Sequence, residues 1–469
     1  MRNVFDGLRH ALARNAARVL PALGIGSGAV AALVLGMSGG EPVQAQNSYS
    51  FTGVASCAGS TCHGRSEGNG AVVRQDEIAT WQSPSAVSGA HSRAYNILQG
   101  RRGRQIVRTL GYNAQQEAEN CYGCHATFAP VSQRGPRFQL DDGVGCESCH
   151  GAAAGWLESH YEVQGTHPNN VRNGLTPLEQ PQARARVCLD CHYGSTDRGQ
   201  FVTHSMMAAG HPRITFELDL FSSFQQHHDV DDDYIQRKGN PDSVRLWAVG
   251  QAEAVARATD LFARPEYGTE GVFPQLYFYD CHSCHRQITD GDERRLTFET
   301  NPGRPITFGQ PPFNDENIIM LATVSDALAP ARAASFRAAA REFHDAMDQG
   351  RGPAQQAAIA LRTEALALSD ALAARGYGGN DGFAVVAQIG SEATSPRFTD
   401  YAGSVQAVMA VDTMLNAMVN EGRITLGAAA GIRTNINRAY DAVNSPTSYR
   451  PAAFRAALGE AVSAIRRLR

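Results

Sequence analysis

The spacing of apolar residues predicts helices in the last third of the chain, residues 315–469. Two sets of apolar positions step by three and four: Leu361, Ala365, Leu368 and Leu372, and Val408, Val411, Leu415 and Met418. Each set lies on one face of a helix. Pro353 suits a helix start, Gly376 suits a stop, and a further break falls at residues 445–446. The pattern predicts an all-α C-terminal bundle of five or six helices.

The preceding region has a different pattern. From residue 46 to about 312 the chain is rich in glycine, histidine and turn residues, with few long periodic stretches. One helix is predicted at residues 243–262. Residues 299–313 hold four prolines and two glycines, a composition typical of a linker. The expected fold is therefore mostly α, with short helices and long loops at residues 46–313 and the helical bundle at residues 314–469.

The first 45 residues have the three regions of a secretion signal. Four arginines form a basic region, an apolar stretch covers residues 23–37, and Val43-Gln44-Ala45 offers small residues for cleavage before Gln46. An uncleaved membrane anchor is the alternative, although several glycines and a serine make the stretch a poor spanning helix. We expect a chain that is exported through the inner membrane to a periplasmic or other extracytoplasmic location.

All ten cysteines fall in five short motifs that end in histidine. Four motifs read C-x-x-C-H, and the first is stretched to C-x-x-x-x-C-H. Numbered here as motifs 1 to 5, they are Cys57/Cys62/His63, Cys121/Cys124/His125, Cys146/Cys149/His150, Cys188/Cys191/His192 and Cys281/Cys284/His285. C-x-x-C-H is the attachment signature of c-type haem, in which two thiols bond the vinyl groups and the histidine binds the iron. The sequence therefore predicts five covalently attached haem c groups.

Paired cysteines also occur in disulfides and zinc knuckles, but neither requires a histidine directly after every second cysteine. Motif 1 must extrude two extra residues between its thioethers, and Cys57 could instead stay unbonded and leave one thioether from Cys62. Five haems in about 270 residues would supply much of the apolar core, which explains why little regular structure is predicted there.

Further histidines in the same region are candidates for the second axial position of each iron. They are His91, His160, His204 and His211, with His167 and His228 as additional candidates. A single histidine is more often a polar surface or core residue, but the proximity of several haems favours ligation. His282, inside motif 5, is interpreted as structural. The aspartates of residues 229–233 are interpreted as a solvated loop, because they lack the glycine and terminal glutamate of a calcium loop.

The surroundings of the motifs resemble the cytochrome c-552/c-554 domain family, which is related to the haem domains of hydroxylamine oxidoreductase. The residues that carry the resemblance are 144–151, which read V-G-C-E-S-C-H-G, then Trp156 and His160, and the stretch 202–219. The similarity covers about residues 50–290. It implies that His160 shares an iron with His63, that His91 shares one with His150, and that the haem of His125 has an open distal side. It implies candidates His204, His211 and His167 for motifs 4 and 5, where this chain departs from the tetrahaem pattern.

Two functions follow from these patterns. The favoured one is electron transfer, because bis-histidine ligation closes both axial positions of an iron. The alternative is a haem oxidoreductase that acts on nitrogen or sulfur oxyanions or hydroxylamine at one open haem. The absence of a C-x-x-C-K motif argues against the lysine-ligated, ammonia-forming nitrite reductase.

The expected partners are redox proteins, either a membrane quinol-side donor or a periplasmic acceptor, with docking through the C-terminal helices as a further hypothesis. The net charge of −4 at pH 7 gives no indication of a nucleic-acid partner. Lys238 is the only lysine, so a cationic docking surface would have to be built from arginine.

Overall fold

The computed structural model describes residues 49–68, 74–213, 215–285, 304–307, 310–395, 398 and 400–469. The predicted signal peptide lies outside these residues, as do positions 299–303 and 308–309 of the predicted linker. The described chain is mostly helical and contains isolated β-bridges but no sheet, which confirms the predicted fold class. Within this part of the chain, no helix combines the length and the apolar character needed to cross a bilayer.

The part of the chain that carries the motifs consists of short helices and loops. Its α-helices are α1 (Glu77–Trp81), α2 (Ala94–Gln99), α3 (Arg101–Leu110), α4 (Ala114–His125), α5 (Cys146–His150), α6 (His167–Arg172), α7 (Pro181–His192), α8 (His204–Ala208), α9 (Leu218–Phe224), α10 (Asp232–Lys238) and α12 (Cys281–Cys284). Short 3-10 or π turns lie between them: η1 (Val54–Ser56), η2 (Val87–Gly89), η3 (Val131–Gln133), η4 (Leu140–Asp142), η5 (Ala153–Gly155), η6 (Ser159–Tyr161), η7 (Pro265–Thr269) and η8 (Leu276–Phe278).

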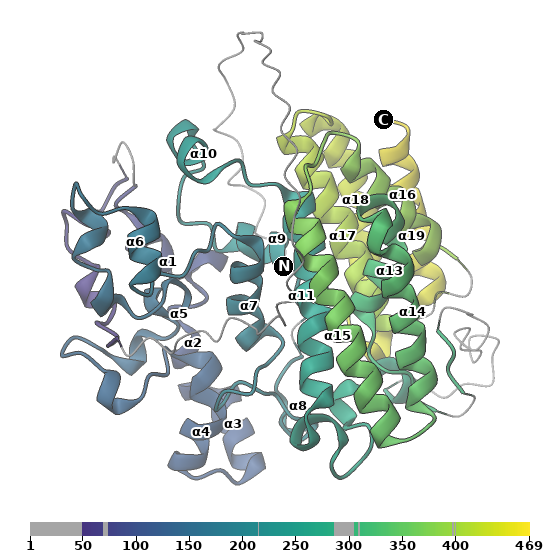
Figure 1. Cartoon of the computed structure of the whole chain (residues 1–469), viewed down its shortest axis with the longest axis horizontal. Coiled ribbons are helices and arrows are strands. Elements are labelled where there is room, and N and C mark those ends of the chain that lie inside the picture. The colour runs from purple at the N-terminus through teal and green to yellow at the C-terminus, as the bar shows by residue number, and fades with distance from the viewer. Residues whose placement is uncertain are drawn as a thin grey trace, which may run out of the picture.

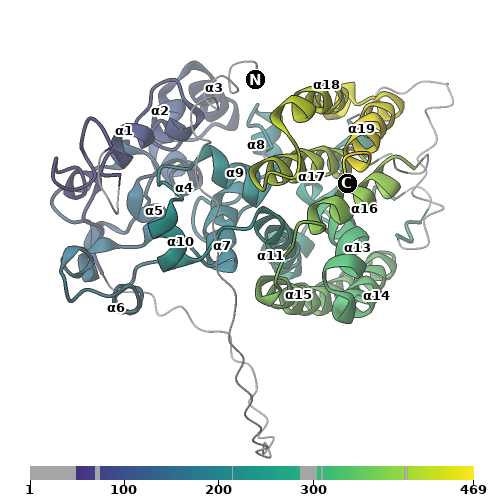
Figure 2. The ribbon, with the colours of Figure 1, turned by 90° about the horizontal axis from the view of Figure 1, so that it is seen from above.

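The C-terminal part forms the predicted bundle, which lies beside the motif-bearing part in both views (Figures 1 and 2). Its helices are α13 (Glu316–Leu328), α14 (Pro330–Met347), α15 (Arg351–Ala374), α16 (Asp381–Ala393), α17 (Tyr401–Asn420), α18 (Leu426–Ala442) and α19 (Pro451–Arg466), with the turn η11 (Pro446–Ser448) before α19. These are seven helices, so the expected five or six was wrong. Only Ala329 separates α13 from α14, and such a short break leaves the apolar pattern almost continuous.

One long helix, α11 (Ser243–Ala263), joins the two parts. It matches the helix predicted at residues 243–262, and its Trp247 and Phe262 are fully buried. On one side α11 packs against α15, α13 and α17, and on the other against α7 and α9 (Figure 2). The apolar core of the bundle therefore extends across the boundary predicted at residue 313, because α11 contributes to the same cluster.

Buried hydrogen bonds fix the bundle to the motif-bearing part. The Thr413 hydroxyl of α17 donates to the Glu217 carboxylate (2.7 Å), and the Gln406 amide donates to the Phe216 carbonyl (3.1 Å). All of these groups are shielded from water, so these two hydrogen bonds form in a buried interface and separating the two parts would break them. The bundle is thus an integral support for the segment that follows motif 4.

Candidate haem attachment and ligand sites

Helical geometry brings the reactive groups of motifs 2 to 5 together. The last residues of α4 and α7, all of α5, and α12 with the residue after it hold these motifs. Positions three apart on a helix lie on one face, so each pair of thiols points to the same side, with the histidine directly after them. In motif 5 the turn is closed by a hydrogen bond from the His285 amide to the Cys281 carbonyl (2.8 Å).

Motif 1 has the same hydrogen bond between its histidine and its first cysteine, but in a segment that is not helical. Residues 57–63 are not helical, yet the His63 amide still donates to the Cys57 carbonyl (3.2 Å). The two extra residues therefore bulge out while the first cysteine and the histidine keep the relation they have in motif 5. No disulfide joins any two of the ten motif cysteines.

Each motif histidine faces a second histidine from elsewhere in the chain. The ring centroids are 6.3 Å apart for His63 and His160, 6.2 Å for His125 and His211, 6.3 and 6.2 Å for His150 with His227 and His228, 6.1 Å for His192 and His91, and 6.2 Å for His285 and His204. A histidine nitrogen lies about 1 Å from its ring centre and binds a metal at about 2 Å, so two imidazoles on opposite sides of one iron have centroids about 6 Å apart. The pairs have the spacing that bis-histidine ligation requires.

Hydrogen bonds at Nδ1 orient many of these rings. Nδ1 lies 2.9 Å from a carbonyl oxygen at His125, 2.8 Å at His211 and 2.7 Å at His227, and His160 bonds the Leu157 carbonyl in the same way. Donation to a carbonyl places the ring proton on Nδ1 and leaves Nε2 free to bind a metal. His63 is oriented instead by the Glu77 carboxylate, whose Oε2 lies 3.0 Å from its Nδ1.

Burial lowers the pKa of several of the facing imidazoles and so favours their neutral form, which is the state that binds a metal. Burial, together with the nearby His228, lowers the pKa of His150 to about 3. Burial likewise lowers the pKa of His192 to about 4 and that of His227 to about 4. His63 differs because its hydrogen bond to Glu77 raises its pKa.

Motifs 1 and 3 are neighbours. The Cys57 and Cys146 thiols interact, which lowers the pKa of Cys57 and raises that of Cys146. Glu147, between the two cysteines of motif 3, accepts hydrogen bonds from the amides of Thr52 and Gly53, each at 2.8 Å. Because these amides lie just before motif 1, the buried carboxylate holds the two motifs side by side.

Motifs 2 and 4 are also neighbours. The Cys191 thiol lies 3.5 Å from the Gly123 carbonyl, and the Cys124 thiol lies 3.9 Å from the Cys191 carbonyl. A Cβ at Gly123 would lie 2.5 Å from the Arg198 carbonyl oxygen and 2.7 Å from Gly199. The glycine in C-Y-G-C-H is therefore required by the close approach of the chain that follows motif 4.

Two further contacts link these pairs to each other and to motif 5. Burial, with the nearby Cys149 of motif 3 as the next cause, raises the pKa of Cys188 in motif 4 to about 12. Tyr277, which is buried, lies near both Cys281 of motif 5 and Cys124 of motif 2, and these thiols contribute to raising its pKa to about 12 after burial. Motif 3 therefore lies beside motif 4, and the segment that leads into motif 5 lies beside motif 4, where the Tyr277 hydroxyl donates to the Tyr193 carbonyl (2.7 Å), and near motif 2.

The structure differs in two places from the pairings that the family resemblance implied. The pairing of His91 with His150 is wrong, because His91 faces His192, while His227 and His228 fill the side of His150. The expected open side at motif 2 is also corrected, because His211 faces His125. Packing of loops that are distant in sequence decides both arrangements.

The other candidate histidines are placed as follows. His160 faces His63, as the resemblance implied, and His204 faces His285. The ring of His167 does not face a motif histidine among the described ring contacts, and its Nε2 lies 2.8 Å from the Glu179 carboxylate. His282 is bound to the bundle, with its Nδ1 2.8 Å from the Pro446 carbonyl oxygen.

Sequence reasoning missed two residues of these sites. It did not select His227, although a histidine doublet directly before an acidic run was a visible signal. It also did not select Glu77, whose carboxylate bonds His63, because a single glutamate 14 residues beyond motif 1 has no distinguishing pattern. Only the fold brings Glu77 and the doublet next to motifs 1 and 3.

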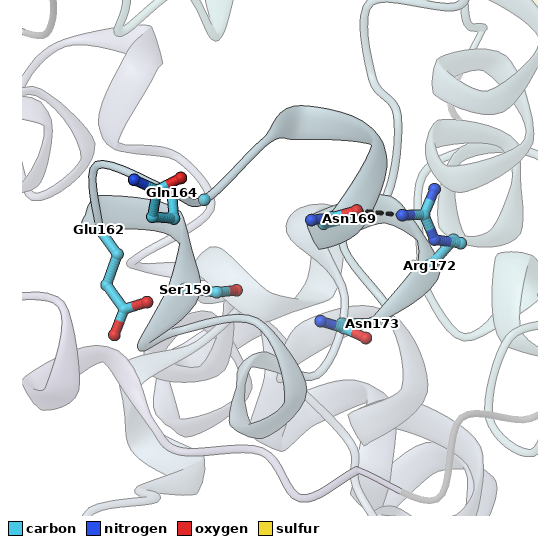
Figure 3. A pocket seen from close by; sticks show the side chains of 7 residues that line it. Ser159, Glu162, Gln164, Asn169, Arg172 and Asn173 are labelled. Carbon is cyan, nitrogen blue, oxygen red and sulfur yellow. Dashed lines mark hydrogen bonds between the residues drawn. The ribbon is translucent and has the colours of Figure 1, made fainter.

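An open polar cavity of about 290 Å³ lies between η6 and α6 (Figure 3). It is lined by Ser159, Glu162, Gln164, Gly165, Asn169, Arg172 and Asn173. No motif cysteine or motif histidine lines it, so this cavity does not provide a substrate site at an axial position.

The attachment motifs, with a second histidine facing each motif histidine, define a c-type cytochrome. More particularly, residues 56–151 match the family model of cytochrome c554 and c-prime, which confirms the resemblance for the segment that contains motifs 1 to 3. The chain therefore binds haem c covalently and has the electron-transfer role of a c-type cytochrome. No curated protein and no solved structure matches the chain.

Proposed function

We propose that this protein is a periplasmic electron carrier with five haem c groups, each ligated by two histidines. The observation that carries the proposal is that every motif histidine has a second histidine whose ring centroid lies 6.1–6.3 Å from its own. Bound haem c supplies reversible one-electron chemistry. The chain's own residues attach it, close its axial positions and arrange the five sites.

Closed axial positions favour a carrier over the alternative oxidoreductase. An enzyme acting on nitrogen or sulfur oxyanions or hydroxylamine would need one iron with a free position. Motif 2 was the candidate for that position, but His211 occupies the side that faces His125. The described residues thus supply a second histidine at every motif.

Two attachment sites are suited to contact with partners. In motif 1, Cys62 is exposed at the surface. In motif 5, Cys284 is exposed, α12 contacts α17 and η11, and His282 bonds Pro446 of the bundle. This arrangement suits a carrier that exchanges electrons with a membrane quinol-side donor at one of these sites and a periplasmic acceptor at the other, with the bundle as a docking module near motif 5.

Intact mass and spectroscopy of the exported full-length protein test the proposal. The expected mass is that of the processed polypeptide plus five haems, with wholly low-spin ferric signals and no binding of carbon monoxide after reduction. A high-spin component that shifts with added nitrite or hydroxylamine would instead support the oxidoreductase. A mass with fewer than five haems would contradict the pentahaem assignment.

Motif 1 has its own test. The Cys57→Ala variant should keep five haems while one haem changes from two thioether bonds to one, which shifts its pyridine haemochrome band. An unchanged band would show that Cys57 is not bonded. The matched control is Cys121→Ala in the regular motif 2, where the same shift is expected.

A further inference from the structure

We infer that Glu77 is a positioning residue shared by the axial ligands of motifs 1 and 3, where it orients His63 and His228 with one carboxylate. The inference rests on the proposed bis-histidine ligation and deepens it. It assigns a role to a residue outside every attachment motif, and it distinguishes motifs 1 and 3 from the other three.

Glu77 is the first residue of α1 and only 5% exposed. Its Oε2 lies 3.0 Å from the Nδ1 of His63, a normal hydrogen-bond length. Its Oε1 is buried without a hydrogen-bond partner among the described residues and lies 3.7 Å from the Nδ1 of His228. That separation is longer than a hydrogen bond but within ion-pair range, so the second oxygen is directed at the second imidazole.

Both contacts use Nδ1, which leaves Nε2 of each ring for the metal. His63 presents its ring to His160, and His228 presents its ring to His150. His227 also faces His150, but its Nδ1 lies 2.7 Å from the Gln225 carbonyl and not against the carboxylate. Either ring thus has its Nε2 free, and the inference assigns His228 as the second ligand of motif 3 because its ring is the one that contacts Glu77.

The segments that carry Glu77 and His228 are fixed to each other by a neighbouring arginine. Arg74 contacts Asp76 (2.9 Å) and Asp229 (3.4 Å), the residues directly before Glu77 and directly after His228. The closeness of Glu77 to both histidines is thus supported by an independent contact between the same two segments.

A carboxylate affects an axial histidine differently from a carbonyl. The Nδ1 groups of His125, His160 and His211 bond neutral backbone carbonyls. A carboxylate is a stronger, charged acceptor, which increases the basicity of the imidazole and stabilises the more positive ferric iron. His63 should therefore give motif 1 a lower reduction potential than a carbonyl-bonded histidine would give.

The test compares Glu77→Gln with the unmodified protein by redox titration monitored by optical and electron paramagnetic resonance spectra. Glutamine keeps the shape but removes the charge. Haem content by intact mass should be unchanged, and the reduction equilibrium of one haem should shift about tenfold towards the reduced form, a rise of about 59 mV for one electron. The low-spin signals of two haems should change, because both His63 and His228 lose the carboxylate.

The matched control is Glu179→Gln, which removes a similar carboxylate–histidine contact at His167, a residue that faces no motif histidine. Its titration and spectra should equal those of the unmodified protein. If Glu77→Gln carries five haems and titrates like this control, the inference is overturned. The proposed function would still stand in that case, provided that the unmodified protein has five haems and wholly low-spin signals. If only one low-spin signal changes, the assignment to His228 is overturned.

A second variant keeps the test decisive if Glu77→Gln does not mature. Glu77→Asp retains the charge but withdraws it by one methylene, so the same potential should rise by less. A titration of Glu77→Asp that is identical to that of the unmodified protein would count against the inference.

Discussion

Replacing His211 by alanine should open one axial position at motif 2. The ring of His211 lies 6.2 Å from that of His125, and its Nδ1 is held at 2.8 Å from the Pro212 carbonyl oxygen. Alanine has no metal-binding group. Among the described ring contacts of His125 there is no other histidine, so no second imidazole is in place to substitute for it.

The size of the effect follows from the number of pairs. Five motif histidines each face their own partner, and His211 takes part in one of these pairs. About one fifth of the haem should therefore change from low-spin to high-spin, and the reduced variant should bind one carbon monoxide per molecule. The other four haems should keep their signals, because their histidines are different residues.

The measurements are the ferric spectrum and a carbon monoxide titration of the reduced, full-length protein. His167→Ala serves as the control, since its ring bonds Glu179 and should leave both readings unchanged. A fully low-spin His211→Ala variant that binds no carbon monoxide would refute the assigned pair. An unmodified protein that already binds one equivalent would refute it as well, and would restore the open haem implied by the family resemblance.

Four other outcomes are expected. Thr413→Val removes the hydroxyl that donates to buried Glu217, and urea unfolding should show a loss of about 1–3 kcal/mol. Burial raises the pKa of Glu217 and of Asp280 to about 8 each, so the folded state is favoured when these groups are protonated, and the melting temperature should fall as the pH rises from about 5 to 8. Glu217→Gln should make the melting temperature depend less on pH, and a melting temperature that rises over this range would contradict the prediction. Leu368→Ala in the fully buried bundle core should cost about 2–5 kcal/mol in urea unfolding while the haem spectrum stays unchanged. Gly123→Ala should lower the yield of mature protein with five haems, measured by intact mass, because its Cβ has no room beside Arg198; normal yield would show that the loop after motif 4 can move.

The attachment chemistry was predictable because it is local. Two thiols and a histidine within five residues define an attachment motif, whatever the rest of the chain does. Helical periodicity is local as well, and the helix predicted at residues 243–262 is α11 with its end one residue later. The mostly α fold and the helical bundle were predictable from the same short-range patterns.

Second ligands were harder to predict because they come from distant parts of the chain. His91 lies nearer in sequence to motifs 2 and 3, yet it faces His192 of motif 4. His211 lies after motif 4, yet it faces His125 of motif 2. No spacing rule connects such residues, and a pairing taken from a shorter family pattern failed for His91.

The sequence by itself therefore determined which residues form the haem attachment motifs, that the fold is helical, and where the longest helices lie. The tertiary structure alone decided which histidine faces which motif, that Glu77 reaches both His63 and His228, and that α11 joins the core of the bundle. The reason is physical. Covalent attachment and helix formation depend on neighbours along the chain, whereas axial pairing and hydrogen bonds to the ligands depend on packing between segments that are remote in sequence.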